Sequence, residues 1–306
     1  MYLIADAAGP VGRAATEQLL GQGQLLRILT ADTQCRDLWR GRGAVVNEGD
    51  PRHASSWVQA LDGIKSVLLL APPFSTEVGS LRDYKAYHSA LIEALSKVEK
   101  KPNVIFLSAL GAKEQLGWAK QLGEMEGQLR DVCPDLIIIR ASFLMENLAP
   151  ALSMAKHHSV LPSFLSENVS FSMVGTKDLV SVLVGAVLDP VEGVNLMELH
   201  GPETYDLSDV VEAGHKVLIK HIASLSLPEE QWQSIMEDQG LDPESAKLWI
   251  DYYRGMNKGL IVSDPIATPL AGETSLSDVL FQVWKNIRTV ERAAIDPEKK
   301  LHKSLE

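Results

Sequence analysis

The first thirteen residues, MYLIADAAGPVGR, place the strongest limit on what this chain can fold into. Tyr2–Ala5 is a short apolar run typical of a buried parallel strand, Gly9 and Gly12 follow it, and residues 14–20 have the pattern of a helix. A glycine at such a turn lets the backbone approach a pyrophosphate, and the N-terminus of a helix offers unpaired N–H groups and a partial positive charge. The segment therefore predicts a dinucleotide site.

Asp6 departs from the usual form of this turn. In the spacing G-x-x-G-x-x-G, Gly9 and Gly12 take the second and third positions and Asp6 takes the first. A side chain there crowds the tightest part of the turn, and a carboxylate repels phosphate. The alternative is that Asp6 points outward or caps the following helix by accepting its N–H groups.

Composition excludes several classes of protein. The chain has 306 residues, 45% of them apolar, a net charge of −11 and a pI near 5.3, which argues against a nucleic-acid surface. No apolar run approaches the roughly 20 residues that span a bilayer, so we expect a cytoplasmic protein. Cys35 and Cys133 are expected to be unpaired thiols, and no H-x-x-x-H or carboxylate cluster predicts a metal site.

Strands and helices alternate through the first half, which predicts an α/β fold with a doubly wound parallel sheet. The expected strands are residues 2–5, 25–30, 44–47, 67–70, 104–107 and 136–139, and the expected longer helices are 82–100 and 116–132. Residues 1–150 are expected to form a dinucleotide-binding domain, with returning segments near 169–200. Residues 151–295 are expected to form a smaller α+β substrate lobe, followed by a polar tail at 296–306.

Ligands of such sheets bind beyond the carboxyl ends of the strands. The residues expected at that edge are 5–13, 30–32, Asp50, 71–74, 108–112 and 140–147. The run YYRGMNKG at 252–259 places polar residues beside aromatic ones, so Tyr252 and Tyr253 are candidates for the substrate pocket.

Several segments, in the right order, are similar to those of a known family. They are GD at 49–50, LLLAPP at 68–73, IIIRASFLMENL at 137–148, SMVGTKDLV at 172–180 and MELHGPETYDLSDVVE at 197–212. The chain resembles the NmrA-like group of atypical short-chain dehydrogenases/reductases over nearly its whole length. The resemblance implies a Rossmann fold that binds NADP or NAD, with a substrate pocket under the second lobe, and it leaves a homodimer open.

The resemblance also assigns site residues. It places Gly9, Pro10, Val11 and Gly12 at the pyrophosphate, Ala71 and Pro72 in the loop near the cofactor riboses, Ser108 at the end of the fifth strand, and Phe143, Met145 and Asn147 in the pocket.

The choice of cofactor stays open at this point. NADP-binding members carry an Arg just after the second strand, where this chain has Ala31 and Asp32. Arg13, Arg36 or Arg40 can substitute as a partner of the 2′-phosphate, although each also suits a solvated helix surface. Asp32 can instead accept a hydrogen bond from the ribose 2′-hydroxyl of NAD.

Catalytic residues are harder to assign because none of the six Tyr residues begins a Tyr-x-x-x-Lys motif. Lys120 is a candidate acid, with an exposed ion pair to Glu124 as its alternative role, and Ser108 is a candidate electrophilic contact. The leading hypothesis is hydride transfer from NADPH, or from NADH, to a carbonyl, enone, imine or quinone of a bulky apolar small molecule. The alternatives are a regulatory protein that senses NAD(P) and a cofactor-independent isomerase or cyclase.

Overall fold

The computed structural model describes residues 1–70 and 81–295, and its centre is a large parallel sheet. Within these residues eight strands pair side by side, every neighbouring pair parallel. In spatial order they are β13 (Thr268–Ala271), β10 (Val194–His200), β6 (Leu136–Ala141), β5 (Asn103–Ala109), β4 (Ser66–Leu70), β1 (Tyr2–Ala5), β2 (Leu26–Thr30) and β3 (Val45–Glu48). The central strands β1, β4 and β6 are buried at every residue, which is why their sequences are mainly apolar. The buried polar exceptions are Ser66 in β4 and Arg140 in β6.

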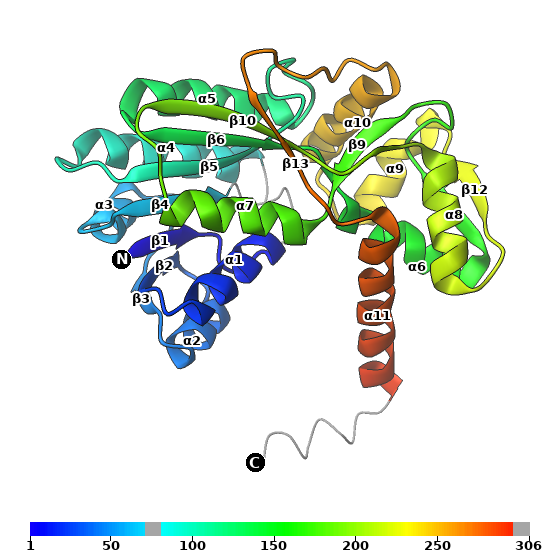
Figure 1. Ribbon diagram of the computed structural model, residues 1–306, viewed down its shortest axis with the longest axis horizontal. Coiled ribbons are helices and arrows are strands. Elements are labelled where there is room, and N and C mark those ends of the chain that lie inside the picture. The colour runs from blue at the N-terminus through cyan, green and yellow to red at the C-terminus, as the bar shows by residue number, and fades with distance from the viewer. Residues whose placement is uncertain (71–80, 296–306) are drawn as a thin grey trace.

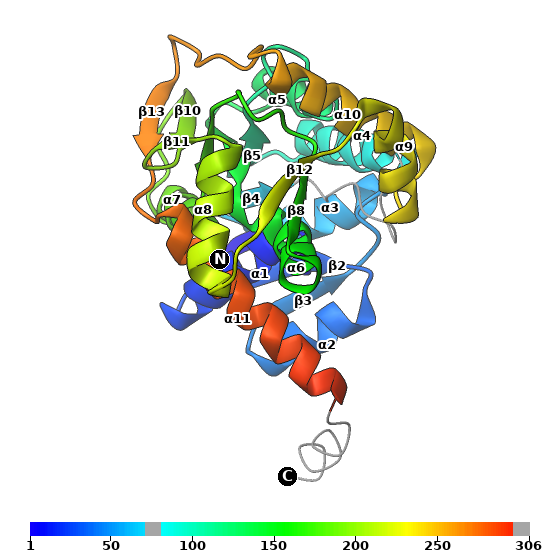
Figure 2. The same cartoon turned by 90° about the vertical axis from the view of Figure 1, so that its right-hand side faces the viewer.

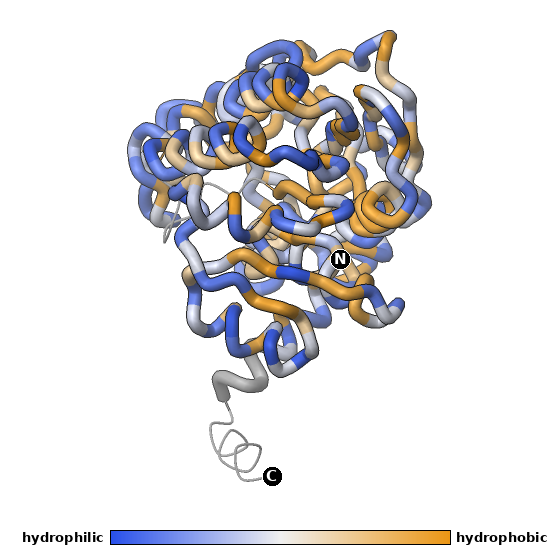
Figure 3. Tube along the Cα trace, turned by 90° about the vertical axis from the view of Figure 1, so that its left-hand side faces the viewer, coloured by the Kyte–Doolittle hydropathy of each residue, from blue (hydrophilic) through white to orange (hydrophobic). Residues whose placement is uncertain are grey.

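Helices cover both faces of this sheet (Figure 1). One face carries α1 (Pro10–Gly21), α2 (Thr33–Gly41) and α7 (Thr176–Leu188), and the other carries α3 (Ala54–Leu61), α4 (Leu81–Lys97) and α5 (Ala119–Val132). Figure 3 shows apolar segments inside this half and polar segments on its outer helices. The predicted doubly wound arrangement is confirmed.

The rest of the second half forms a smaller lobe beside one end of the sheet (Figures 1 and 2). Its strands are β7 (Phe143–Leu144), β8 (Val160–Ser163), β9 (Phe171–Val174), β11 (Thr204–Tyr205) and β12 (Ala223–Ser226). Its helices are η1 (Met145–Leu148), α6 (Ala149–His158), α8 (Leu207–Leu218), α9 (Glu229–Asp238), α10 (Pro243–Asn257) and α11 (Leu276–Ile295). This lobe follows directly from the carboxyl end of β6, so it lies next to the edge where ligands of such sheets bind.

Some elements differ from the expectation. Helix α1 begins at Pro10 rather than at residue 14, and α5 begins at Ala119 rather than at 116. Gly117 explains the second difference: its φ is +47°, and a Cβ there would lie 2.1 Å from the carbonyl oxygen of Leu248, so the chain turns tightly against α10 before the helix starts. Strand β13 was not predicted, because it is a short, largely exposed edge strand that contains Pro269. The expected tail at 296–306 lies outside the described residues.

Candidate functional site

The glycine turn at the end of β1 has the close packing that its sequence predicts. Gly9 is the last residue before α1, and a Cβ on Gly12 would lie 2.1 Å from the carbonyl oxygen of Asp6 and 2.9 Å from Leu70 Cδ1. Only glycine therefore fits at position 12. The helix begins with Pro10, and no side chain in the described part of the chain caps it. Its first N–H groups are thus available to an anion.

Asp6 lies against this turn. Its φ is +59°, a left-handed conformation that Asp adopts more readily than most residues. A Cβ on Gly9 would lie 2.5 Å from Asp6 Oδ2, so the carboxyl group rests on the face of Gly9. The Gly9 N–H donates to the backbone carbonyl oxygen of Asp6 at 3.3 Å and also interacts with the carboxyl group. Burial raises the pKa of Asp6 from 3.8 to about 7, and the Gly9 hydrogen bond only partly offsets that effect. The carboxyl group therefore takes space that a pyrophosphate would need.

A cavity of about 260 Å³, here called the strand-end cavity, opens beside this turn. It is bordered by the turn, by the carboxyl ends of β4, β5 and β6, and by α10. The predicted site residues that line it are Pro10, Val11, Ser108, Phe143, Asn147 and Tyr252. The lining is mainly apolar, which suits a flat hydrophobic molecule or the nicotinamide end of a cofactor.

Tyr84 also lines the strand-end cavity, and the sequence analysis did not select it. It lies on α4 and is 3% exposed, and burial raises the pKa of its hydroxyl well above the usual value. The available signal was its place near the start of the helix after the fourth strand, where a side chain can reach the carboxyl edge of the sheet.

The hydroxyl group of Ser108 already has a hydrogen-bond partner within the protein. Its hydroxyl donates to Glu126 Oε1 over 2.6 Å, and Glu126 receives a bidentate guanidinium from Arg140, with Nε to Oε1 at 2.9 Å and Nη2 to Oε2 at 2.6 Å. All three residues are buried. Because the single hydrogen of Ser108 faces Glu126, the side that faces the cavity presents lone pairs.

Arg140 joins this group to two acids from the second half of the chain. Its Nη1 donates to Asp264 Oδ2 at 3.1 Å and lies 3.8 Å from Glu198 Oε1, while Lys113 Nζ lies 3.0 Å from Asp264 Oδ1. Although burial opposes it, the hydrogen bonds from Lys113 and Arg140 hold the pKa of Asp264 below its usual value. The Arg140 network thus pairs buried charges that lie up to 124 residues apart in sequence.

The residues expected to select the cofactor all have protein partners. The carboxylate of Asp32 accepts from the N–H groups of Gln34 and Cys35, so it caps α2. Arg36 and Arg40 both donate to Glu48, at the end of β3. Arg13 is half exposed and lies 3.8 Å from Glu17.

The other predicted residues have different positions. Asp50 forms a bidentate pair with Arg52, whose hydrogen bonds lower the pKa of Asp50. Lys120 is exposed on α5 and is not among the described residues that line the strand-end cavity. Met145 is fully buried, and Tyr253 packs against Phe164, Trp232 and Trp249. Ala71 and Pro72 lie outside the described residues.

Residues 1–70 and 81–295 contain neither a cluster of metal ligands nor a membrane-spanning helix. No three His, Cys, Asp or Glu side chains there are grouped to hold a metal ion. No helix there has the length and apolar character needed to cross a bilayer.

The structure was then compared with known proteins. No protein-family model matches the chain, and no curated protein matches it in sequence. Solved structures do match. The NADPH-dependent quinone oxidoreductase of Escherichia coli, complexed with NADPH, superimposes with a TM-score of 0.77 at 20% identity, over 93% of this chain and 100% of that one. The predicted Rossmann fold is confirmed.

Two further structures have the same fold. The triphenylmethane reductase of Citrobacter sp. matches with a TM-score of 0.77 at 13% identity, over 93% of this chain and 99% of that chain. An isoflavone reductase matches with a TM-score of 0.65 at 17% identity, over 92% and 98%. The likeness covers the smaller lobe as well as the sheet, because nearly the whole of each chain is aligned.

Proposed function

We propose that this protein is an NADPH-dependent reductase of a bulky apolar small molecule that carries a carbonyl, enone, imine or quinone. The observation that carries the proposal is the apolar strand-end cavity beside the uncapped N-terminus of α1. The fold supports it, since a quinone oxidoreductase of this fold is complexed with NADPH and a triphenylmethane reductase of this fold with NADP(H).

The turn from Gly9 to Gly12 would hold the pyrophosphate through backbone N–H groups, and the strand-end cavity would take the nicotinamide and the substrate. The residues fit this role except for Asp6, whose carboxyl group must be protonated or displaced. A bound nicotinamide supplies the hydride. The chain has to orient the substrate and exclude water, and side chains such as Leu70, Phe143 and Tyr252 do so.

Tyr84 is proposed as the hydrogen-bond donor to the substrate oxygen. It lines the cavity, and its phenol is protonated at neutral pH, as a tyrosine of ordinary pKa also is. Ser108 is a weaker donor than the sequence analysis expected, because its hydrogen is bound by Glu126. Lys120 is exposed outside this cavity, so we give it no part in the proposed chemistry.

Arg36 and Arg40 are proposed to meet the 2′-phosphate of NADPH. They lie on α2, which starts just after β2, where the adenosine ribose binds in folds of this kind. Glu48 accepts from both and competes with a phosphate for them. Glu48→Gln should therefore strengthen NADPH binding several-fold relative to NADH, since charge-assisted bonds to the two guanidinium groups become available.

Asp6 favours a second candidate function. A protein that does not bind a dinucleotide can have a carboxyl group on the glycine turn, because no pyrophosphate has to fit there. Such a protein could be a cofactor-independent isomerase or cyclase. A nucleotide-binding protein that only senses NAD(P) is the third candidate.

Titration of the purified protein with NADPH and with NADH, followed by nicotinamide fluorescence, tests these functions. The reductase proposal expects saturable NADPH binding, stronger in Glu48→Gln, and NADPH-dependent loss of absorbance with 1,4-naphthoquinone or a related acceptor. Binding without turnover on any carbonyl, enone, imine or quinone in a broad panel would favour the sensor. Failure to bind either nucleotide would overturn both and leave the isomerase or cyclase.

A further inference from the structure

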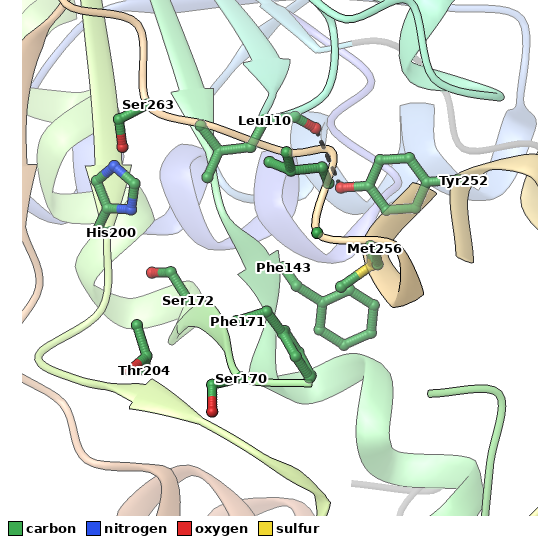
Figure 4. Close-up of a pocket in the computed structure, with 12 residues that line it drawn as sticks. Leu110, Phe143, Ser170, Phe171, Ser172, His200, Thr204, Tyr252, Met256 and Ser263 are labelled. Atoms are coloured by element: carbon green, nitrogen blue, oxygen red, sulfur yellow. Dashed lines mark hydrogen bonds between the residues drawn. The ribbon is translucent and has the colours of Figure 1, made fainter. Parts of the chain in front are cut away.

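A second cavity lies on the other side of Phe143 and Tyr252, where the sheet meets the smaller lobe (Figure 4). It measures about 250 Å³ and is here called the His200 cavity. His200 is the last residue of β10, Ser172 lies on β9 and Met256 lies near the end of α10. The cavity is therefore lined by elements that lie far apart in the sequence, from β7 to α10.

One wall of the His200 cavity is apolar. Phe143 and Phe171 meet edge to face, with ring centroids 5.9 Å apart, and Met256 and Tyr252 continue the same wall. Tyr252 is held in place because its hydroxyl donates to the carbonyl oxygen of Leu110 over 3.1 Å, the dashed line in Figure 4. This wall is suited to the face of an aromatic ring.

The opposite wall carries neutral hydrogen-bonding groups. Figure 4 shows Ser172, Thr204 and Ser263 around the ring of His200. Ser172 Oγ accepts from the N–H of Gly201 at 3.3 Å, so its own hydrogen can point elsewhere. Hydroxyl groups donate and accept equally well, which suits a ligand with a hydroxyl or a carbonyl group.

Charge complementarity excludes an anionic ligand end. None of the described residues that line the His200 cavity is Lys or Arg. Arg140 and Lys113 are paired with the buried acid Asp264, and Glu198 Oε2 lies 3.7 Å from His200 Nε2. A carboxylate or phosphate would meet an acidic neighbour and no available cation, so a neutral group is favoured.

The two cavities are neighbours, since Phe143 and Tyr252 line both. Each cavity alone is smaller than the roughly 300 Å³ at which ligand pockets for drug-sized molecules begin. We propose that the His200 cavity binds the neutral hydroxyl- or carbonyl-bearing end of an aromatic substrate whose reducible ring lies in the strand-end cavity. This inference rests on the reductase function proposed above and narrows its substrate class.

The test measures binding, so that it does not depend on turnover. Isothermal titration calorimetry on the full chain, with and without saturating NADPH, compares 1,4-naphthoquinone with its 6-hydroxy and 6-carboxylate derivatives. We expect the hydroxy compound to bind about 5-fold more tightly than the parent, which is the worth of one net hydrogen bond of about 1 kcal/mol. The carboxylate should bind more weakly than the parent.

Two variants place this preference at the His200 cavity. Ser172→Ala and His200→Leu should each reduce the preference for the hydroxy compound, whereas Ser234→Ala, which removes an exposed hydroxyl on α9, should leave it unchanged. Circular dichroism checks that each variant is folded. Equal binding of the three compounds, absence of binding, or a preference that survives both variants would overturn the inference.

Turnover separates this inference from the function on which it rests. Loss of NADPH absorbance with all three quinones at similar KM would support the reductase and overturn the role of the His200 cavity. A hydroxyl preference that disappears in Ser172→Ala and His200→Leu, without oxidation of NADPH by these quinones or by any acceptor of the broader panel, would support a ligand site in the His200 cavity and overturn the reductase.

Discussion

Asp6 and Glu126 are acidic side chains near the carboxyl ends of β1 and β5, and their surroundings are opposite. Asp6 is partly buried against the Gly9 backbone and lines the mainly apolar strand-end cavity, and among the described residues no cation pairs with it. Glu126 is 1% exposed, yet it holds a bidentate guanidinium from Arg140 and the hydroxyl of Ser108. Burial without a partner drives a carboxyl group toward its neutral form, whereas burial with a partner builds a charge pair into the core.

The Arg140 network and Asp6 have different roles. The Arg140 network, with Glu126, Glu198 and Asp264, ties the sheet to the segment before β13. Removing Arg140 takes away the only buried cation of this network among the described residues, because Lys113 and Arg130, the other cations that contact its acids, are partly exposed. Asp6 has no such ties, so its charge can change without disrupting the fold. We therefore expect the network to govern stability and Asp6 to govern ligand binding.

Arg140→Leu should have the largest effect. Among the described residues, it leaves buried Glu126 with only the partly exposed Arg130, at 3.4 Å, and Asp264 with only Lys113, so the free energy of unfolding should fall by about 3 kcal/mol. Urea denaturation followed by Trp fluorescence measures this. The double variant Arg140→Leu with Glu126→Leu should recover part of the loss, because one uncompensated charge is removed. A loss below about 1 kcal/mol, the size typical of an exposed ion pair, would contradict the expectation that the Arg140 network governs stability.

Asp6 should make both stability and nucleotide binding depend on pH. Its pKa is raised from 3.8 to about 7 in the folded state, so the folded chain binds this proton more tightly than the unfolded chain. The contribution to the free energy of unfolding is therefore greatest below about pH 4 and is lost as the pH rises toward 7. Affinity for NADH should also fall as the pH rises through about 7, because an ionised Asp6 repels the pyrophosphate.

Asp6→Asn tests whether Asp6 causes this pH dependence. Asn has nearly the same size as Asp, carries no charge and also tolerates positive φ. The variant should lose this component of the pH dependence in urea denaturation and in NADH titrations, and should bind NADH more tightly than the native chain at pH 8. Asp6→Gly should behave in the same way. If both variants keep the native pH profile, Asp6 is not the titrating group.

Ser108→Ala should have the smallest effect of the three. It removes one hydrogen bond to Glu126 while Arg140 keeps both of its own, so we expect a loss of about 1.5 kcal/mol in the free energy of unfolding. Ser96→Ala, which removes an exposed hydroxyl bonded within α4, is the matched control and should change stability by less than about 0.5 kcal/mol. A loss as large as that of Arg140→Leu would show that Ser108 is an essential part of the network.

The first half of the fold was predictable because the pattern of apolar residues along the sequence indicates which faces of a strand or helix are buried. Runs such as residues 136–139 are apolar throughout since both of their faces are covered, and the helices between the strands carry an apolar face. The edge strand β13 was not predicted because it is largely exposed and contains Pro269. The two-residue strands β7 and β11 were not predicted because they are too short to show a period.

The sequence by itself determined the doubly wound sheet, the glycine turn and the need for Gly12, since these depend on local spacing and on backbone packing next to one strand. Only the tertiary structure decided that Ser108 donates to Glu126, that Asp264 meets Arg140 across 124 residues, and that Tyr84 and His200 line cavities. Such contacts depend on strand register and on how the second lobe packs against the sheet. A side chain's neighbours in space are set there, and no local pattern along the chain records them.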